Sequence, residues 1–119
     1  MRYYLFILFI LFISNYLYYI FITIMPRTKD NKPILNKPFK SKVKGKKYSV
    51  YVKSNTKKGY KVINFGATGY DDWRSGTATK EQRKSYLARA KGIKNKQGQL
   101  TWKDKSTANY WSVRYLWAG

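Results

Sequence analysis

The uneven distribution of charge is the feature that most constrains what this chain can fold into. Arg2 is the only charged residue in positions 1–25, so the other 94 residues carry 24 of the 25 basic side chains and all five acidic ones, a net charge of +19. Self-repulsion of this size opposes a compact state unless salt or an anionic partner screens it. We therefore expect one small domain whose partner is nucleic acid, an anionic membrane or an acidic protein.

The composition also excludes several kinds of chemistry. The chain has no cysteine and no histidine, which removes disulfides, thiolate nucleophiles, Cys/His zinc sites and imidazole acid–base catalysis. Few carboxylates remain as bases or metal ligands: Asp30, Asp71, Asp72, Glu81 and Asp104. We expect a binding protein rather than an enzyme, and no cofactor.

The N-terminal segment 1–25 has two interpretations. Residues 3–25 are uncharged and long enough for a helix through a bilayer, which needs about 20 residues; the basic flank would then stay on the cytoplasmic side. Alternatively, its Phe, Ile, Leu, Tyr and Asn content is typical of translated AT-rich upstream DNA, and translation starts at Met25. The pattern leaves both open.

The next segment, residues 26–45, contains all three prolines and a high density of lysine. Its few bulky apolar residues are Ile34, Leu35, Phe39 and Val43. This composition is typical of a disordered basic arm. Such an arm either contacts phosphate or is a solvated linker.

Two strands follow the arm. Residues 46–53 alternate so that Tyr48, Val50 and Val52 share one face, and residues 60–65 alternate in the same way. The polar stretch 54–59 between them predicts a turn, and together they predict an antiparallel hairpin. Because a lone hairpin is only marginally stable in water, another element must cover one face.

A helix is predicted over residues 80–91. Thr79 and Gln82 fit a capping box, and Gly92 suits the position after the helix. The apolar face is expected to lie across the hairpin and contains Tyr86, Leu87, Ala90 and Ile93. Beside it runs a basic stripe of Lys80, Lys84 and Lys91, with Arg89 on the far side.

The C-terminal segment 108–117 is rich in aromatic residues and follows Thr107, a suitable N-cap. Helical spacing pairs Trp111 with Tyr115, whereas alternate residues along the same segment also fit a strand. The pattern alone leaves helix and strand open.

An acidic and aromatic cluster lies at residues 70–73. We expect Tyr70 and Trp73 to cap the core and Asp71 and Asp72 to pair with nearby cations. A divalent metal on the two aspartates is the alternative, although adjacent side chains rarely converge on one ion and no third ligand is evident.

Several short motifs follow one another over residues 46–118: Phe65-Gly66, Gly69, Tyr70, Asp72, Trp73, Arg83, Tyr86, Arg89, Trp102, Thr107, Ala108, Trp111, Ser112, Leu116 and Trp117. In this order they resemble an uncharacterised family of small basic proteins from large double-stranded DNA viruses of eukaryotes and some tailed phages. The resemblance implies a viral origin and a helical C-terminus, and brings no established activity. The family has His where Ala90 stands, and here the stretch 92–101 is enlarged.

The sequence therefore predicts an α+β fold. An antiparallel β-hairpin is packed by an amphipathic helix and a short aromatic C-terminal helix in a basic domain over residues 46–119. A hydrophobic N-terminal helix and the disordered basic arm precede it. A domain this small needs its large side chains inside, so we expect in the core Trp73, Tyr86, Trp102, Trp111 and Trp117.

The function we expect is sequence-independent binding of viral nucleic acid, in packaging or a related role. Lys and Arg release counterions from phosphate, and no base-reading motif is present. The expected phosphate contacts are Lys46, Lys47, Lys80, Arg83, Lys84, Arg89 and Lys91, helped by the arm.

Two other hypotheses belong to different classes. One is a structural virion component, either a minor capsid protein or an inner-membrane-associated protein, that contacts capsid proteins. The other is a small DNA-processing enzyme that uses Asp71 or Asp72. We expect the protein in the virion or in viral factories of the host cytoplasm, anchored to a membrane if residues 3–25 are expressed.

Overall fold

The computed structural model describes residues 27–29 and 31–119 and divides the chain into two units, residues 1–34 and residues 35–119. In the first unit, the backbone N–H of Thr28 donates to the carbonyl of Lys32 at 2.7 Å. The predicted hydrophobic helix or alternative start at residues 1–25 lies outside the described residues. Within the described ranges, no helix is long and apolar enough to cross a bilayer.

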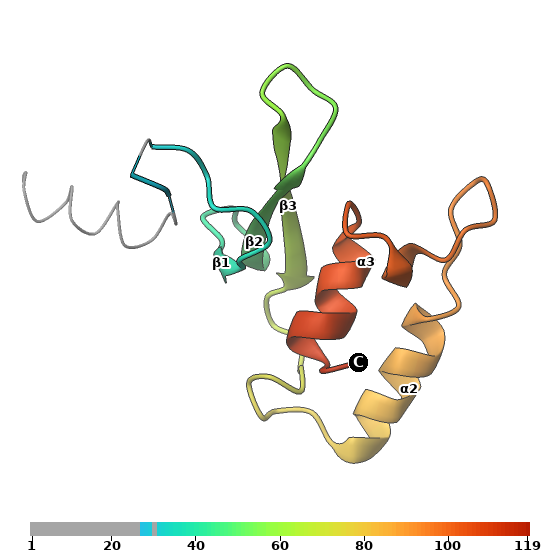
Figure 1. Cartoon of the computed structure of the whole chain (residues 1–119). Helices are drawn as coiled ribbons and strands as arrows, with labels where there is room; N and C mark the ends of the chain where they lie inside the picture. The colour runs from blue at the N-terminus through green and yellow to red at the C-terminus, as the bar shows by residue number, and fades with distance from the viewer. Residues whose placement is uncertain (1–26, 30) are drawn as a thin grey trace, which may run out of the picture. The chain divides into compact units, whose positions relative to one another are not determined.

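The second unit combines a three-stranded antiparallel sheet, in the order β1-β2-β3, with helices that follow it in sequence (Figure 1). The strands are β1 (Phe39–Lys40), β2 (Lys46–Lys53) and β3 (Tyr60–Ala67). The helical elements are α2 (Lys80–Ala90), the 3₁₀ turn η1 (Thr101–Lys103), α3 (Ala108–Trp111) and the π-helical turn η2 (Ser112–Leu116). The predicted α+β class, the hairpin and the short aromatic C-terminal helix are confirmed.

The hairpin of β2 and β3 has the predicted alternation. Val50 lies opposite Ile63, and Tyr48 lies opposite Phe65. Val50 and Phe65 are fully buried, as the period of two residues requires for one covered face. β2 has the predicted bounds, and β3 continues past Phe65 to Ala67.

The prediction that residues 26–45 form a disordered arm is wrong for the part that follows Leu35. Phe39 and Lys40 form β1, which pairs antiparallel with β2, and the Asn36 backbone N–H donates to the carbonyl of Tyr51 at 2.8 Å. The apolar residues of this segment supply the reason, because the Phe39 ring stacks on Tyr51 with ring centroids 5.4 Å apart. The compact unit therefore begins before β2.

The C-terminal segment is a helix and not a strand. Thr107 caps it, since its hydroxyl accepts a hydrogen bond from the backbone N–H of Tyr110. α3 and η2 form one continuous helix, which closes with a hydrogen bond from the Trp117 N–H to the carbonyl of Ser112 at 3.2 Å. Ala118 then adopts a φ of 51°, a left-handed conformation typical of a helix end.

The helix that covers the sheet is this C-terminal helix. Figure 1 shows it between the sheet and α2. Its Trp111 packs on Phe65 of β3, and its Trp117 stacks on Tyr86 of α2 with ring centroids 4.2 Å apart. The prediction that α2 lies across the hairpin is therefore wrong. The core cluster consists of Val50, Val52, Ile63, Phe65, Trp111, Leu116 and Trp117.

α2 has the predicted start and a narrower buried face than predicted. The Thr79 and Gln82 capping box is present, with both hydrogen bonds made. Ala90 is buried and Leu87 is partly buried against the core, but Ile93 is 51% exposed. The helix ends at Ala90, so Ile93 lies beyond it, where helical spacing no longer places a side chain on the same face.

Candidate nucleic-acid interface

The predicted phosphate-contacting residues do not all point to solvent. Lys80, Lys84 and Arg89 of α2 are exposed, as is Lys46 at the start of β2. Lys91 follows α2 and is half-buried, with its ammonium 5.0 Å from the ring centre of Trp102. The remaining two, Lys47 and Arg83, make contacts within the fold.

Arg83 closes the C-terminal end of the chain. Its Nε donates to the carbonyl of Trp117 and its Nη2 to the carbonyl of Ala118, both at 2.8 Å. The last carbonyls of a helix have no partner within the helix, and a cation there also complements the helix dipole. Arg83 is therefore a structural residue that fastens α2 to the C-terminal helix, and its assignment to phosphate binding is corrected.

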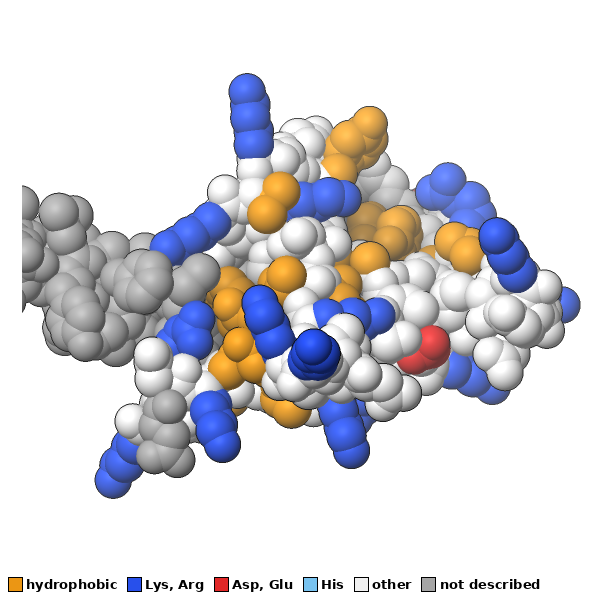
Figure 2. All heavy atoms as spheres, turned by 90° about the horizontal axis from the view of Figure 1, so that it is seen from above, with side chains coloured by type: hydrophobic (Ala, Val, Ile, Leu, Met, Phe, Trp, Pro, Cys, Tyr) orange, Lys and Arg blue, Asp and Glu red, His pale blue; other side chains and the backbone are white. Residues whose placement is uncertain are grey.

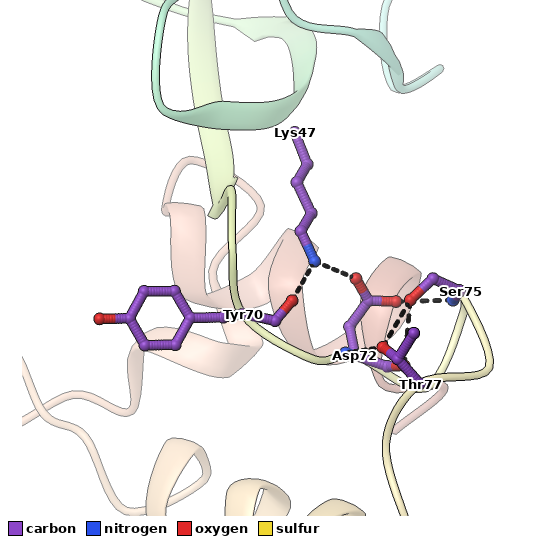
Figure 3. A network of polar contacts seen from close by, with 5 residues as sticks. All are labelled: Lys47, Tyr70, Asp72, Ser75 and Thr77. Atoms are coloured by element: carbon purple, nitrogen blue, oxygen red, sulfur yellow. Dashed lines mark hydrogen bonds and ion pairs between the residues drawn. The ribbon is translucent and has the colours of Figure 1, made fainter.

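Lys47 reaches from β2 to the loop that follows β3 (Figure 3). Its ammonium donates to the Asp72 carboxylate at 2.6 Å and to the carbonyl of Tyr70. The other Asp72 carboxylate oxygen accepts the backbone N–H of Ser75 at 2.7 Å. Because Asp72 is buried, this network ties the loop to the sheet, and Lys47 too is removed from the predicted phosphate contacts.

Burial and hydrogen bonding act in opposite directions on Asp72. Burial alone raises the pKa of its carboxyl, because the charged form loses water. The hydrogen bonds from Lys47 and Ser75, together with the charge of Lys47, outweigh burial and hold the pKa below its ordinary value of 3.8. The carboxylate is thus stabilised in its charged form within the fold.

The neighbouring aromatic residues lie outside the core. Tyr70 is 74% exposed and Trp73 is 36% exposed, so the prediction that they cap the core is wrong. In Figure 3 the Tyr70 ring points away from the polar network. The guanidinium of Arg83 lies 5.2 Å from the ring centre of Trp73, which covers one side of that ring. Of the five aromatic residues expected in the core, only Trp111 and Trp117 are buried, with Tyr86 and Trp102 half-buried.

A groove lies between the loop after β3 and α2. Its volume is about 390 Å³, and it is lined by Tyr70, Asp71, Asp72, Tyr86, Arg89, Ser112, Leu116 and Trp117, among others. Burial raises the pKa of the Tyr86 hydroxyl above its ordinary value. The hydrogen bond with Ser112 and the charge of Arg89 lower this pKa, but by less than burial raises it. Two of the predicted cations, Lys47 and Arg89, border this groove, but Lys47 is already bound to Asp72, whereas Arg89 is exposed.

Several cations lie over aromatic rings on the helical side of the molecule. The guanidinium of Arg74 is 3.9 Å from the ring centre of Tyr115, and that of Arg114 is 4.8 Å from the ring centre of Tyr110. Lys103 joins Lys91 at Trp102. Such contacts occur about once per 70–80 residues in proteins, so this small unit is rich in them.

One of these additional cations has a signal in the sequence. Arg114 lies four residues after Tyr110, a spacing that brings two helical side chains together. Arg74 reaches Tyr115 from a distant loop, and no local pattern predicts that contact. Figure 2 shows Lys and Arg side chains over one face of the molecule, with hydrophobic patches between them and little acidic surface.

The metal alternative has no geometric support in residues 27–29 and 31–119, where no group of three His, Cys, Asp or Glu side chains could hold an ion. Both carboxylate oxygens of Asp72 already accept hydrogen bonds within the fold. Asp71 is exposed and borders the groove.

Comparison with known proteins gave no family model, no curated protein and no solved structure that matches this chain.

Replacing Arg83 by Gln should destabilise the fold by about 1–3 kcal/mol, because two carbonyls at the helix end lose a charged donor. The matched control is Lys84→Gln, which removes the same charge from the next residue, where the side chain is exposed. Thermal and urea unfolding of both variants measure the difference. Equal stability of the two variants would contradict a structural role for Arg83.

Replacing Asp72 by Asn should make the free energy of unfolding less dependent on pH in the acid range. Since the folded pKa of Asp72 is below 3.8, its contribution is fully present above that value and is lost as pH falls through the lower folded pKa. We expect the difference in unfolding free energy between wild type and Asp72→Asn to be constant from about pH 7 to about pH 5 and to shrink below about pH 3.8.

The control for this pH series is Asp71→Asn, because Asp71 is adjacent in sequence but exposed. It should differ little from wild type at every pH. A pH-independent difference for Asp72→Asn, or the same acid response in both variants, would show that the Lys47 ion pair does not stabilise the fold.

Proposed function

We propose that this protein binds nucleic acid without regard to sequence, through contacts between phosphates and its Lys and Arg side chains. The observation that carries the proposal is how few cations the acidic side chains neutralise. Within residues 27–29 and 31–119, the carboxylate of Asp72 forms a salt bridge with Lys47. Asp104 is engaged by the backbone and hydroxyl of Ser106. A large net positive charge therefore remains for an external anion.

The physical basis of binding is counterion release. Each cation that neutralises a phosphate releases condensed counterions, so the affinity falls steeply with salt and does not depend on base sequence. Of the residues predicted from the sequence, Lys46, Lys80, Lys84, Arg89 and Lys91 remain in the proposed contact set. To them we add three further cations that lie over aromatic rings, Arg74, Lys103 and Arg114.

The resemblance to small basic viral proteins supports a role with a viral genome, such as packaging. Most of the resembling motif has a structural use in this fold. Asp72 binds Lys47, Arg83 binds the C-terminal carbonyls, and Tyr86 stacks on Trp117. Arg89 differs from these because it is exposed at the groove, where a phosphate could reach it.

The direct test is binding of the full chain, kept in a non-ionic detergent because of its apolar first 25 residues, to unrelated duplexes across a salt series. We expect equal affinity for all sequences and a slope of log affinity against log salt that corresponds to several phosphates. Negligible binding at physiological salt would contradict the proposal and favour the alternative, a structural virion component that contacts an acidic protein or a membrane.

A double variant tests whether the lysines of α2 contact phosphates. Lys80→Gln with Lys84→Gln should reduce the magnitude of the salt slope by about two, roughly one for each phosphate that is no longer neutralised. The matched control is Lys94→Gln with Lys96→Gln, which removes the same charge from the exposed loop after α2. Equal effects of the two double variants would show diffuse binding and contradict a localised interface at α2.

A further inference from the structure

The sheet has a second face, and it carries a row of aromatic rings. The Phe39 ring of β1 stacks on the Tyr51 ring of β2, with centroids 5.4 Å apart and ring planes 26° from parallel. The Tyr60 ring of β3 meets Tyr51 edge-on at 5.7 Å. One aromatic ring from each strand therefore forms a continuous row across the sheet.

This row lies on the face opposite the core. Successive side chains of a strand point to opposite faces, and Val50 and Val52, the neighbours of Tyr51, are buried under the C-terminal helix. The open face is also apolar around the row. Val62, directly opposite Tyr51 in the register, is 49% exposed, and Leu35 is 40% exposed. The three rings are themselves half-buried.

The segment that forms this face carries only positive charge. Residues 35–67, which contain all three strands, have ten lysines and no acidic residue. One of these lysines, Lys47, is used by Asp72, and Lys61 lies near the carboxylate of Asp104. An apolar face surrounded by lysines is complementary to a ligand that is both aromatic and anionic.

Lys53 stands at the end of the row, on the same face. It lies two residues after Tyr51 in β2 and pairs with Tyr60 in the sheet register, and its side chain is exposed. Lys61 lies between Tyr60 and Val62 in β3 and therefore belongs to the opposite face, near the carboxylate of Asp104. The exposed ammonium of Lys53 beside the tyrosine rings is suited to a backbone phosphate.

We propose that this open sheet face binds single-stranded nucleic acid, with unpaired bases stacking on Tyr51 and Tyr60 and a backbone phosphate at Lys53. The inference rests on the proposed function, because it names which form of nucleic acid the protein takes. A duplex presents no free base faces, whereas every unpaired base does, and such stacking tolerates any sequence. An acidic peptide would satisfy the lysines but leave the aromatic row without a partner.

The test compares Tyr51→Leu and Tyr60→Leu with wild type in the full chain, using oligothymidine and a duplex of the same length as probes. Stacking is worth about 1–3 kcal/mol per base, so each variant should lose roughly 5-fold to 150-fold in affinity for the single strand. The affinity for the duplex should stay within about 2-fold, since phosphate contacts are unchanged.

The control is Ile93→Ala, because Ile93 is an exposed apolar residue that follows α2 and lies outside both the sheet and the groove. It should bind both probes as wild type does. Equal affinity of the sheet variants and wild type for oligothymidine would overturn the inference while leaving the proposed function intact. Failure of the wild type to bind either probe would overturn both.

Tyr51 also contacts Phe39, so its replacement could loosen β1, and melting curves must accompany the binding data. A second measurement does not depend on any variant. Ultraviolet cross-linking of wild type to oligothymidine, followed by peptide mapping, should place the adducts in the β1, β2 and β3 peptides. Adducts confined to the peptides of α2 or the C-terminal helix would overturn the inference.

Discussion

The rest of the structure depends on the apolar faces of the C-terminal helix. Trp111 and Leu116 are buried in the core cluster with Phe65, and Trp117 stacks on Tyr86 of α2. One short helix therefore supplies the contact surface for both the sheet and α2, and the burial of large aromatic side chains is a main source of stability in so small a core. Arg83 fastens the same helix at its end through two carbonyls.

This arrangement determines which parts of the surface carry the positive charge. Because the helix occupies one face of the sheet, the other face keeps its aromatic row at the surface, within a segment that has ten lysines and no acidic residue. The buried carboxylate of Asp72 is satisfied by Lys47 inside the fold. Most of the remaining positive charge lies outside the core, where it repels itself until an anion or salt screens it. Stability and the proposed binding of nucleic acid thus depend on the same charge.

Local patterns predicted the parts of the fold that depend on near neighbours. The alternation in β2 and β3 and the capping box at Thr79 are signals of this kind. β1 has only two residues and is held by partners in β2, so composition alone suggested disorder. The roles of Lys47 and Arg83 depend on partners 25 and 34 residues away, and a single sequence does not show which lysine or arginine is satisfied inside the fold. The alternation that puts Val50 and Val52 on one face also puts Tyr51 on the other, but Phe39 joins that face only through the unpredicted pairing of β1.

Binding of an anionic aromatic ligand to the open sheet face can be observed by ring-proton NMR during titration of the full chain with a short oligothymidine. We expect upfield shifts of the ring signals of Phe39, Tyr51 and Tyr60, because a stacked base lies over them. The indole signals of the buried Trp111 and Trp117 should stay in place. Shifts confined to α2 and the groove, with the three sheet rings unchanged at saturation, would show that nucleic acid does not bind to this face.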